Sequence, residues 1–364
     1  MRRLGRVGGG LLGLFGLGVS GGLLNLFGAA AALGLGSEAR ERNERGLQAA
    51  SRGDQAGAEK LYREAIEQWG RLGPEFSPHL GITEFNLAQS LCAQGRRGEA
   101  MPVLEDSLAR LRGSLGVRHL STLSVMNYLA SLRLMLGDMP GAETLLREAL
   151  PIERELYPRD EQLPLTLGAL SSLLVRRKQV AEALPLAEEA LTLSLQVSGE
   201  DSLQAALAYA DVAAVHKWAN RYDRALPLYR KALSLYERLV GPDHPRTAGV
   251  LGEIGLIEME DGNYALAERD MLRSLEIAQH APGWTFEEWI GESNLGMLRY
   301  KQGKYDEAAR RFGRSLSLQE QAGIHGGPDL ALTLESLAKV RDKQRRYADA
   351  KELREREAAA GAGQ

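Results

Sequence analysis

The chain has 364 residues, 26% of them charged, and a formal net charge of −3. Three bases, Arg2, Arg3 and Arg6, precede residue 38 and no acid does, so the remainder carries a net charge of −6. No long basic run is present, and we expect no nucleic-acid partner, because binding a phosphate backbone requires clustered Lys and Arg. The single cysteine, Cys92, excludes an intrachain disulfide and a thiolate metal cage.

The first segment of the chain, residues 7–37, contains no charged residue and is rich in Leu, Phe and Gly. It is long enough to cross a bilayer. Glycine weakens a helix in water but is tolerated in lipid, where an unpaired backbone costs more. We therefore predict an N-terminal apolar helix that makes membrane contact through residues 7–36. The preceding arginines would stay in the cytoplasm, which places the rest of the chain on the non-cytoplasmic side.

Two alternatives to this membrane anchor remain open. The segment is also compatible with a cleaved export signal, with Ala29-Ala30-Ala31 as its cleavage site. The other alternative is a disordered Gly-rich N-terminus on a cytoplasmic protein.

After this segment, small residues recur at intervals of 41 or 42 positions. They are Ala58, Ala100, Ala142, Ala183, Ala225, Ala267, Ala308 and Ala350. A period this strict indicates one structural unit copied end to end. In most copies a large apolar residue follows the marker alanine by four positions and a small residue by seven, which is one stripe of an α-helix.

A second pattern precedes each marker alanine. An apolar and a small residue stand thirteen and twelve positions earlier, as in Leu87-Ala88, and a glycine or Asn220 usually stands five positions earlier. Gly or Asn just past a helix adopts the left-handed conformation that ends it. Each copy is therefore predicted to be helix, tight turn, helix. The small residues allow the two backbones to approach and the large ones fill the gaps. Pro and Gly between copies, as in residues 241–245, predict the inter-repeat turns.

The seventh copy, with Leu295-Gly296, Ala308, Phe312 and Ser315, resembles a tetratricopeptide repeat. The longer period, with turns such as residues 241–247, is similar to the kinesin light chain subclass. The resemblance implies an all-α fold: an α-solenoid, a right-handed superhelix of about eight helix-turn-helix units. It divides the chain into an N-terminal segment (1–37), the repeat array (38–357) and a disordered tail (358–364).

The sequence offers no pattern for catalysis. No two histidines have the spacing of a helical metal site, and the array contains no nucleophile elbow or phosphate-binding loop. His119 and His244 fall in equivalent inter-repeat turns, which favours a structural role. We therefore expect no enzyme, no metal and no cofactor.

The candidate binding residues lie in the first helix of each unit, which in this family lines a concave face. The resemblance implies that asparagines there clamp a peptide backbone, since a carboxamide both donates and accepts. Aromatic neighbours would supply anchors. The predicted binding residues are Asn86, Asn127, Tyr128, Trp218, Asn294, Tyr300 and Lys301.

These residues predict the kind of partner. Asp211, Glu253 and Glu260 make the centre of the face acidic, which favours a neutral or basic segment of a protein or peptide. The function predicted is a non-catalytic adaptor. The alternative is a regulatory sensor whose superhelix changes when a peptide or ligand binds. The oligomeric state is left open.

Overall fold

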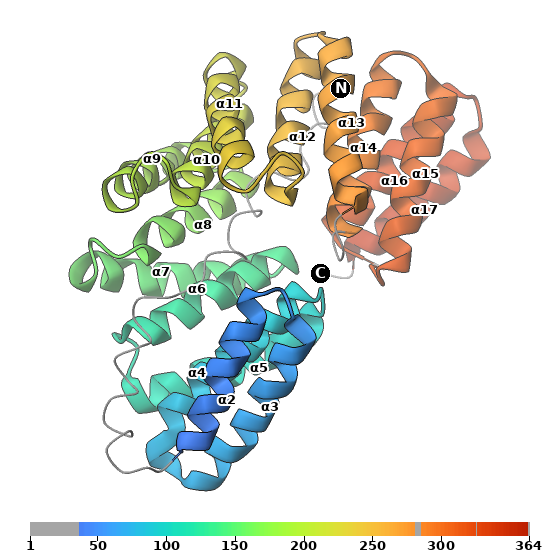
Figure 1. Ribbon diagram of the computed structural model, residues 1–364. Helices are drawn as coiled ribbons and strands as arrows, with labels where there is room; N and C mark the ends of the chain where they lie inside the picture. The colour runs from blue at the N-terminus through green and yellow to red at the C-terminus, as the bar shows by residue number, and fades with distance from the viewer. Residues whose placement is uncertain (1–35, 281–284, 325, 363–364) are drawn as a thin grey trace. The chain divides into compact units, whose positions relative to one another are not determined.

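The computed structural model describes residues 36–280, 285–324 and 326–362. Over these ranges the chain forms sixteen α-helices, one 3-10 turn (Pro74–Phe76) and no strand (Figure 1). The helices pair in chain order into eight hairpins, which confirms the predicted repeat. They are α2 (Ser37–Ser51), α3 (Gln55–Leu72), α4 (Ser77–Ala93), α5 (Arg97–Leu115), α6 (Leu120–Met135), α7 (Met139–Leu156), α8 (Gln162–Arg176), α9 (Val180–Val197), α10 (Leu203–Trp218), α11 (Tyr222–Leu239), α12 (Pro245–Glu260), α13 (Tyr264–His280), α14 (Thr285–Lys301), α15 (Tyr305–Gln321), α16 (Pro328–Lys343) and α17 (Tyr347–Ala362).

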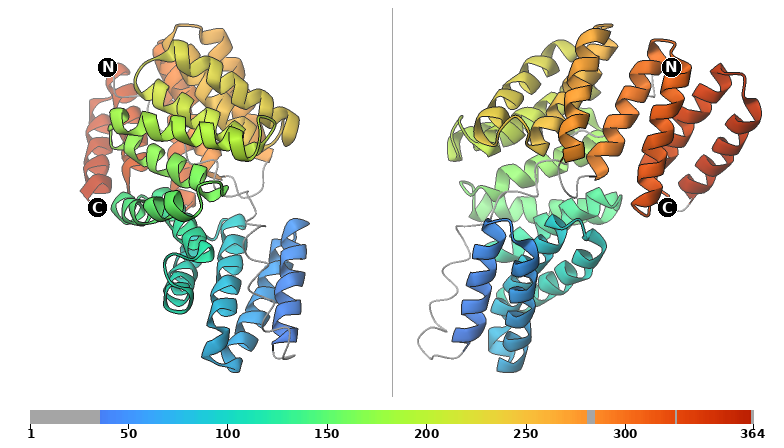
Figure 2. Two further views of the ribbon diagram at one scale, coloured as in Figure 1. Left: turned by 90° about the vertical axis from the view of Figure 1, so that its left-hand side faces the viewer. Right: turned by 45° about the vertical axis from the view of Figure 1, so that its right-hand side comes forward.

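The hairpins form two compact units that divide between Leu170 and Ser171, within α8. We call the described residues before this point the N-terminal unit and those after it the C-terminal unit. Within each unit the second helix of one hairpin packs against the first helix of the next, as for α3 with α4 and α13 with α14 (Figure 2). Each unit is therefore built by stacking neighbours in sequence.

The marker alanines explain why the two helices of a hairpin lie so close together. All eight have no more than a trace of exposed surface. The small residue twelve positions earlier faces the large residue four positions after the marker. A methyl group on Gly46 would lie 2.5 Å from Cε1 of Tyr62, and one on Gly296 would lie 3.0 Å from Cδ1 of Phe312. The predicted packing of small against large residues is confirmed in both units.

The turns inside the hairpins use the left-handed backbone conformation. In the N-terminal unit all three have a glycine there, namely Gly53, Gly95 and Gly137. The C-terminal unit has two glycines and three residues that carry a side chain: Lys178 (φ 63°), Asn220 (φ 56°) and Arg345 (φ 61°). The role of Asn220 was predicted, whereas Lys178 and Arg345 were not. A residue with a Cβ atom is less stable than glycine in the left-handed conformation, so these turns carry a cost in backbone free energy that glycine would avoid.

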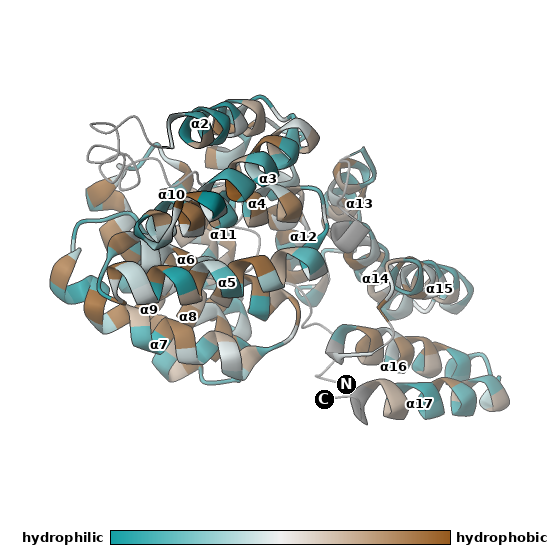
Figure 3. Ribbon diagram, turned by 90° about the horizontal axis from the view of Figure 1, so that it is seen from below, coloured by the Kyte–Doolittle hydropathy of each residue, from teal (hydrophilic) through white to brown (hydrophobic). Residues whose placement is uncertain are grey.

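The first helices of the hairpins are buried on nearly all sides. In α4, α6, α10 and α12 almost every residue from the first turn onward is buried, including the polar ones. Such a helix lies between its hairpin partner and the neighbouring hairpins, and it shows no wide polar face. Helix α2, which begins the stack, is mostly hydrophilic (Figure 3). A polar outer surface is typical of a terminal repeat, which has one face without a neighbouring repeat.

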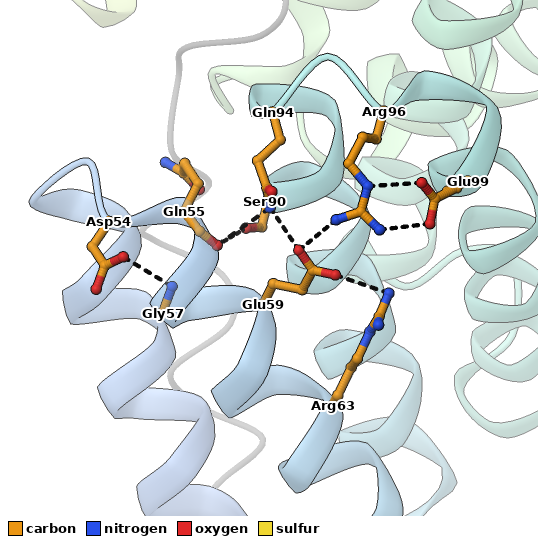
Figure 4. Close-up of polar contacts among 9 residues, drawn as sticks. All are labelled: Asp54, Gln55, Gly57, Glu59, Arg63, Ser90, Gln94, Arg96 and Glu99. Carbon is orange, nitrogen blue, oxygen red and sulfur yellow. Dashed lines mark hydrogen bonds and ion pairs between the residues drawn. The ribbon is translucent and has the colours of Figure 1, made fainter.

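Polar side chains lock the first two hairpins together (Figure 4). Glu59 on α3 accepts hydrogen bonds from Nε2 of Gln94 (2.8 Å) and Nη1 of Arg96 (2.7 Å). The Ser90 hydroxyl donates to the backbone carbonyl of Gln55 (2.9 Å). Burial raises the pKa of Glu59, but the bonds from Gln94 and Arg96 outweigh it and hold the pKa below its ordinary value. The ionised carboxylate therefore serves as the acceptor that joins α3 to the end of α4.

The structure corrects the prediction of a membrane-anchored protein. The apolar helix expected in residues 7–36 falls almost wholly on residues 1–35, which lie outside the described part of the chain. Among the helices from α2 to α17, none is long and apolar enough to cross a membrane. The longest, α5, has 19 residues and carries several charges, whereas a span needs about 20 predominantly apolar residues. The anchor is therefore not supported.

The end of the array also differs from the expected boundary. Helix α17 continues to Ala362, through most of the segment expected as a tail. Ala358, Ala359 and Ala360 have high helix propensity. The carbonyl of Ala360 accepts a hydrogen bond from the backbone N–H of Gly327 (3.0 Å), which holds this end of the helix against the turn before α16.

Candidate functional site

The residues predicted to bind a partner divide between the two compact units. Those in the N-terminal unit are Asn86, Asn127 and Tyr128, and those in the C-terminal unit are Trp218, Asn294, Tyr300 and Lys301. Each group is therefore described within its own unit.

Both asparagines of the N-terminal unit are bonded within the protein. Asn86 on α4 is buried, and its Nδ2 donates to Oδ1 of Asn43 on α2 (3.0 Å). Asn127 on α6 is also buried, and its Nδ2 donates to Oε1 of Glu153 on α7 (2.7 Å). The Nδ2 donor of each carboxamide is therefore committed to a bond that joins two helices, while Oδ1 of Asn127 is buried without a hydrogen-bond partner among the described residues.

Asn127 has a structural role, because it is bonded to the buried carboxyl group of Glu153. Glu153 has no exposed surface, and burial raises the pKa of its carboxyl group, against the opposing effect of the hydrogen bond from Asn127. A buried carboxyl group that loses its donor pays its full desolvation cost. Asn127 therefore stabilises the pairing of α6 with α7.

Tyr128 packs inside the same unit. Its ring meets that of Phe85 edge to face, with 5.4 Å between centroids, and its hydroxyl lies beside the thiol of buried Cys92. Burial raises the pKa of both Tyr128 and Cys92 above their ordinary values. These contacts join α4 to α6.

Three predicted residues of the C-terminal unit lie near the ends of first helices. Trp218 is half-buried at the end of α10. Tyr300 is half-buried and packs edge to face on Tyr305, with centroids 5.6 Å apart. Lys301 is exposed, and its Nζ donates to Oε2 of Glu260 at the end of α12 (2.7 Å).

Asn294 occupies a different setting, a cleft between α14, α15 and α16. The cleft is small, with a cavity volume of about 20 Å³. Apolar side chains form most of its walls, and Asn294 and Ser336 add polar groups. The residues that define it here are Trp289, Asn294, Met297, Phe312, Leu332 and Ser336.

The carboxamide of Asn294 is uncommitted. It makes no hydrogen bond to any residue that the structure describes, although only 6% of the residue is exposed. Its Nδ2 lies close to Gly252 of α12, because a methyl group placed on that glycine would be 3.7 Å from it. The carboxamide therefore lies over a helix position that has no side chain. Asn294 can therefore both donate to and accept from a ligand in the cleft.

Two of the three hydroxyl groups at the cleft, those of Ser293 and Thr333, are engaged. Ser293 Oγ lies 2.8 Å from Ser315 Oγ on α15. Nε2 of Gln319 donates to Thr333 Oγ1 (2.8 Å), which in turn donates to the carbonyl of Asp329 (3.1 Å). These bonds leave Asn294 and Ser336 as the open polar groups of the cleft.

The aromatic and aliphatic walls could not be predicted from the repeat pattern. Trp289 lies on α14, Phe312 on α15 and Leu332 on α16, so the cleft forms only when two hairpins stack. Phe312 was recognised as a packing residue of its own hairpin. No signal in the sequence indicated that it also lines a cleft with α16.

Comparisons with known proteins agree with this architecture. A family model described as tetratricopeptide repeat matches residues 80–155, 162–238, 205–280 and 290–359. A clustered mitochondria protein homolog from Debaryomyces hansenii is 25% identical over 169 residues. That match covers 46% of this chain but only 12% of the relative, so the chain spans a small part of that protein's length.

Two solved structures share the fold. A Rap protein complexed with competence and sporulation factor has a TM-score of 0.66 at 13% identity, over 89% of this chain and 85% of that one. NprR in complex with its cognate peptide NprX has a TM-score of 0.62 at 15% identity, over 86% of each chain. The resemblance stated from the repeat pattern is confirmed, because the family model covers most of the sequence: the chain belongs to the tetratricopeptide repeat family.

Proposed function

We propose that this protein is a non-catalytic interaction scaffold that binds an extended segment of a partner protein in the cleft between α14 and α16. The observation that carries the proposal is the unbonded carboxamide of Asn294 inside a mainly apolar cleft. A free polar group among apolar walls is the usual design of a site that fixes both the position and the orientation of a ligand.

The cleft would take the tip of one apolar side chain, with the main chain next to it at the open mouth. Trp289, Phe312 and Leu332 would surround the side chain, and Asn294 would bond the N–H and carbonyl of an adjacent peptide group. The binding of NprX by NprR, a protein of the same fold, supports a peptide as the class of ligand.

The expected strength of this contact is limited. Burying a leucine-sized side chain contributes about 1.5–3 kcal/mol, and each hydrogen bond adds about 0.5–1.5 kcal/mol net. Micromolar affinity corresponds to about 8 kcal/mol. The cleft alone therefore anchors a partner, and further contacts along the unit must contribute the remainder.

The test is selection of peptides from a random linear 12-residue display library, with the full chain as bait. We expect the wild type to enrich sequences that share one large apolar residue. Asn294→Asp keeps the size of the side chain but removes its donor, and it should weaken the selected peptides at least about tenfold, a change of about 1.4 kcal/mol.

The matched control is Asn263→Asp, at an exposed position in the turn between α12 and α13. This variant should bind the selected peptides as the wild type does. Failure of the wild type to enrich any peptide, or equal binding by Asn294→Asp and wild type, would contradict the proposal.

A further inference from the structure

A row of polar side chains extends from the cleft along the C-terminal unit. The position fourteen residues before the marker alanine holds Asp211 on α10, Glu253 on α12, Asn294 on α14 and Ser336 on α16. All four residues are only 4–6% exposed. Because Asn294 and Ser336 line the cleft from this position, Asp211 and Glu253 hold the equivalent place on the helices that precede it.

Glu253 is already neutralised within the protein. Its Oε2 is paired with Nζ of Lys217 on α10, and both side chains are buried. Burial raises the pKa of Glu253, and the charge of Lys217 opposes that effect. A buried carboxylate with a bonded lysine has no need of an external cation.

Asp211 has no such partner. Its Oδ1 is buried and makes no hydrogen bond within the described structure. Tyr229 and Tyr236 face it from α11. Glu253 on α12, the partner of Lys217, also acts on Tyr229, and Arg246 lies over the ring of Tyr236. Burial alone raises the pKa of Asp211 to about 8, with no cation to lower it, so the group is mostly protonated at pH 7.

We propose that Asp211 is the subsite for a lysine or arginine side chain of the same peptide whose apolar residue occupies the cleft between α14 and α16. This inference rests on the proposed function. A basic side chain would supply the charge-assisted partner that the carboxyl group lacks, and ion pairing inside a protein requires that both charges be matched.

The spacing of the two subsites follows from helix packing. Packed helices lie about 8–10 Å apart, so α10 is separated from the cleft by roughly 20–25 Å. An extended chain advances about 3.3 Å per residue. The basic residue should therefore stand about six to eight positions from the apolar one in the bound segment.

The proton balance gives a signature of this contact. The bound cation stabilises the carboxylate form, so Asp211 gives its proton to the solvent when the peptide binds. The incoming cation and the new carboxylate then form a neutral pair. Binding at pH 7 should release close to one proton per peptide.

The experiment uses the full chain and a peptide selected from the 12-residue library, synthesised with arginine and with citrulline, its neutral analogue. The wild type should bind the arginine peptide at least about tenfold more tightly than the citrulline peptide. Asp211→Asn should bind the two within about twofold of each other. Asp261→Asn, at the exposed end of α12, is the matched control and should keep the tenfold preference.

A second measurement separates ligand contact from a structural role. Titration calorimetry in two buffers of different ionisation enthalpy should report release of a proton with the wild type and none with Asp211→Asn. A tenfold preference that survives in Asp211→Asn, or wild type that selects peptides without a basic residue, would overturn the inference and leave the cleft in place. If the wild type selects no peptide, the proposed function fails and this inference fails with it.

Discussion

Asn127 in the N-terminal unit stands fifteen residues before its marker alanine and Asn294 in the C-terminal unit stands fourteen before its own, so their side chains leave the first helix about 100° apart, and they have opposite surroundings. Asn127 donates to Glu153 on the partner helix of its hairpin, whereas Asn294 has no hydrogen-bond partner among the described residues and lines a cleft. The residue type is the same, and the shift of one position turns the two side chains toward different neighbours. In a stack of helical hairpins, the polar group available to a ligand is the one that the neighbouring helices leave unbonded.

The largest effect that would sharpen this comparison is on stability. Asn127→Ala removes one of the two side-chain donors, with Thr166, of a carboxyl group that has no exposed surface, and we expect it to destabilise the N-terminal unit by about 1–3 kcal/mol. Asn294→Ala breaks no hydrogen bond and should cost about 0.5 kcal/mol. Hydrogen exchange of the full chain measures each unit separately. Equal losses for the two variants would show that Asn294 is also a structural residue.

The second prediction concerns the close helix contact at the marker alanines, which both units share. Ala225 in the C-terminal unit and Ala142 in the N-terminal unit are both fully buried between the helices of a hairpin. Replacing either with Leu forces extra atoms into a closed contact and should cost about 1–3 kcal/mol. Thermal melts with unit-resolved hydrogen exchange check this. An unchanged stability in one variant would mean that this unit is packed less tightly than the other.

The packing was predictable from the sequence because it depends on residues that are close together in the chain. The marker alanines and the pairs they define, such as Gly46 with Tyr62, lie within one hairpin and repeat at every copy. Each of these pairs predicts the same contact in every copy of the repeat. The same holds for turns that contain glycine, such as that at Gly137.

The candidate site was only partly predictable, because a free side chain is defined by distant residues. Asn86 is bonded to Asn43, which lies 43 residues earlier, and Asn127 is bonded to Glu153, 26 residues later. Neither bond leaves a periodic signal. Asn86 and Asn294 stand at the same repeat position, fourteen residues before their marker alanines, and only the stacked helices distinguish them; Asn127 stands one position earlier.

The turns provide a third prediction, in which the two units should respond with opposite signs. Lys178 in the C-terminal unit has a left-handed backbone (φ 63°), so Lys178→Gly should stabilise that unit by about 0.5–1 kcal/mol. Gly137 in the N-terminal unit has φ 90°, and Gly137→Ala should destabilise its unit by about 1 kcal/mol. Denaturant unfolding monitored in each unit measures both changes. Destabilisation by Lys178→Gly would show that contacts of the lysine side chain outweigh its backbone cost.

The smallest expected effect concerns a histidine that caps the start of a first helix, with one such cap in each unit. The Nδ1 atoms of His119 and His244 accept hydrogen bonds from the backbone N–H groups of Ser121 (3.1 Å) and Arg246 (3.2 Å), at the starts of α6 and α12. Burial lowers the pKa of both histidines, and for His244 the charge of Arg246 adds to it. Only the neutral ring can accept this bond.

Because the folded state lowers these pKa values, the caps stabilise the protein above the unfolded pKa of about 6.5, and that stability is lost as the pH falls below it. Each cap contributes about 1 kcal/mol or less. Asparagine provides a similar acceptor that does not titrate, so His119→Asn should remove the loss between pH 7 and pH 5 in the N-terminal unit, and His244→Asn in the C-terminal unit. Unit-resolved hydrogen exchange at both pH values measures this. If either variant kept the pH dependence of the wild type, another group in that unit would be responsible, such as His216 on α10, whose pKa burial also lowers, and the two caps would not be equivalent.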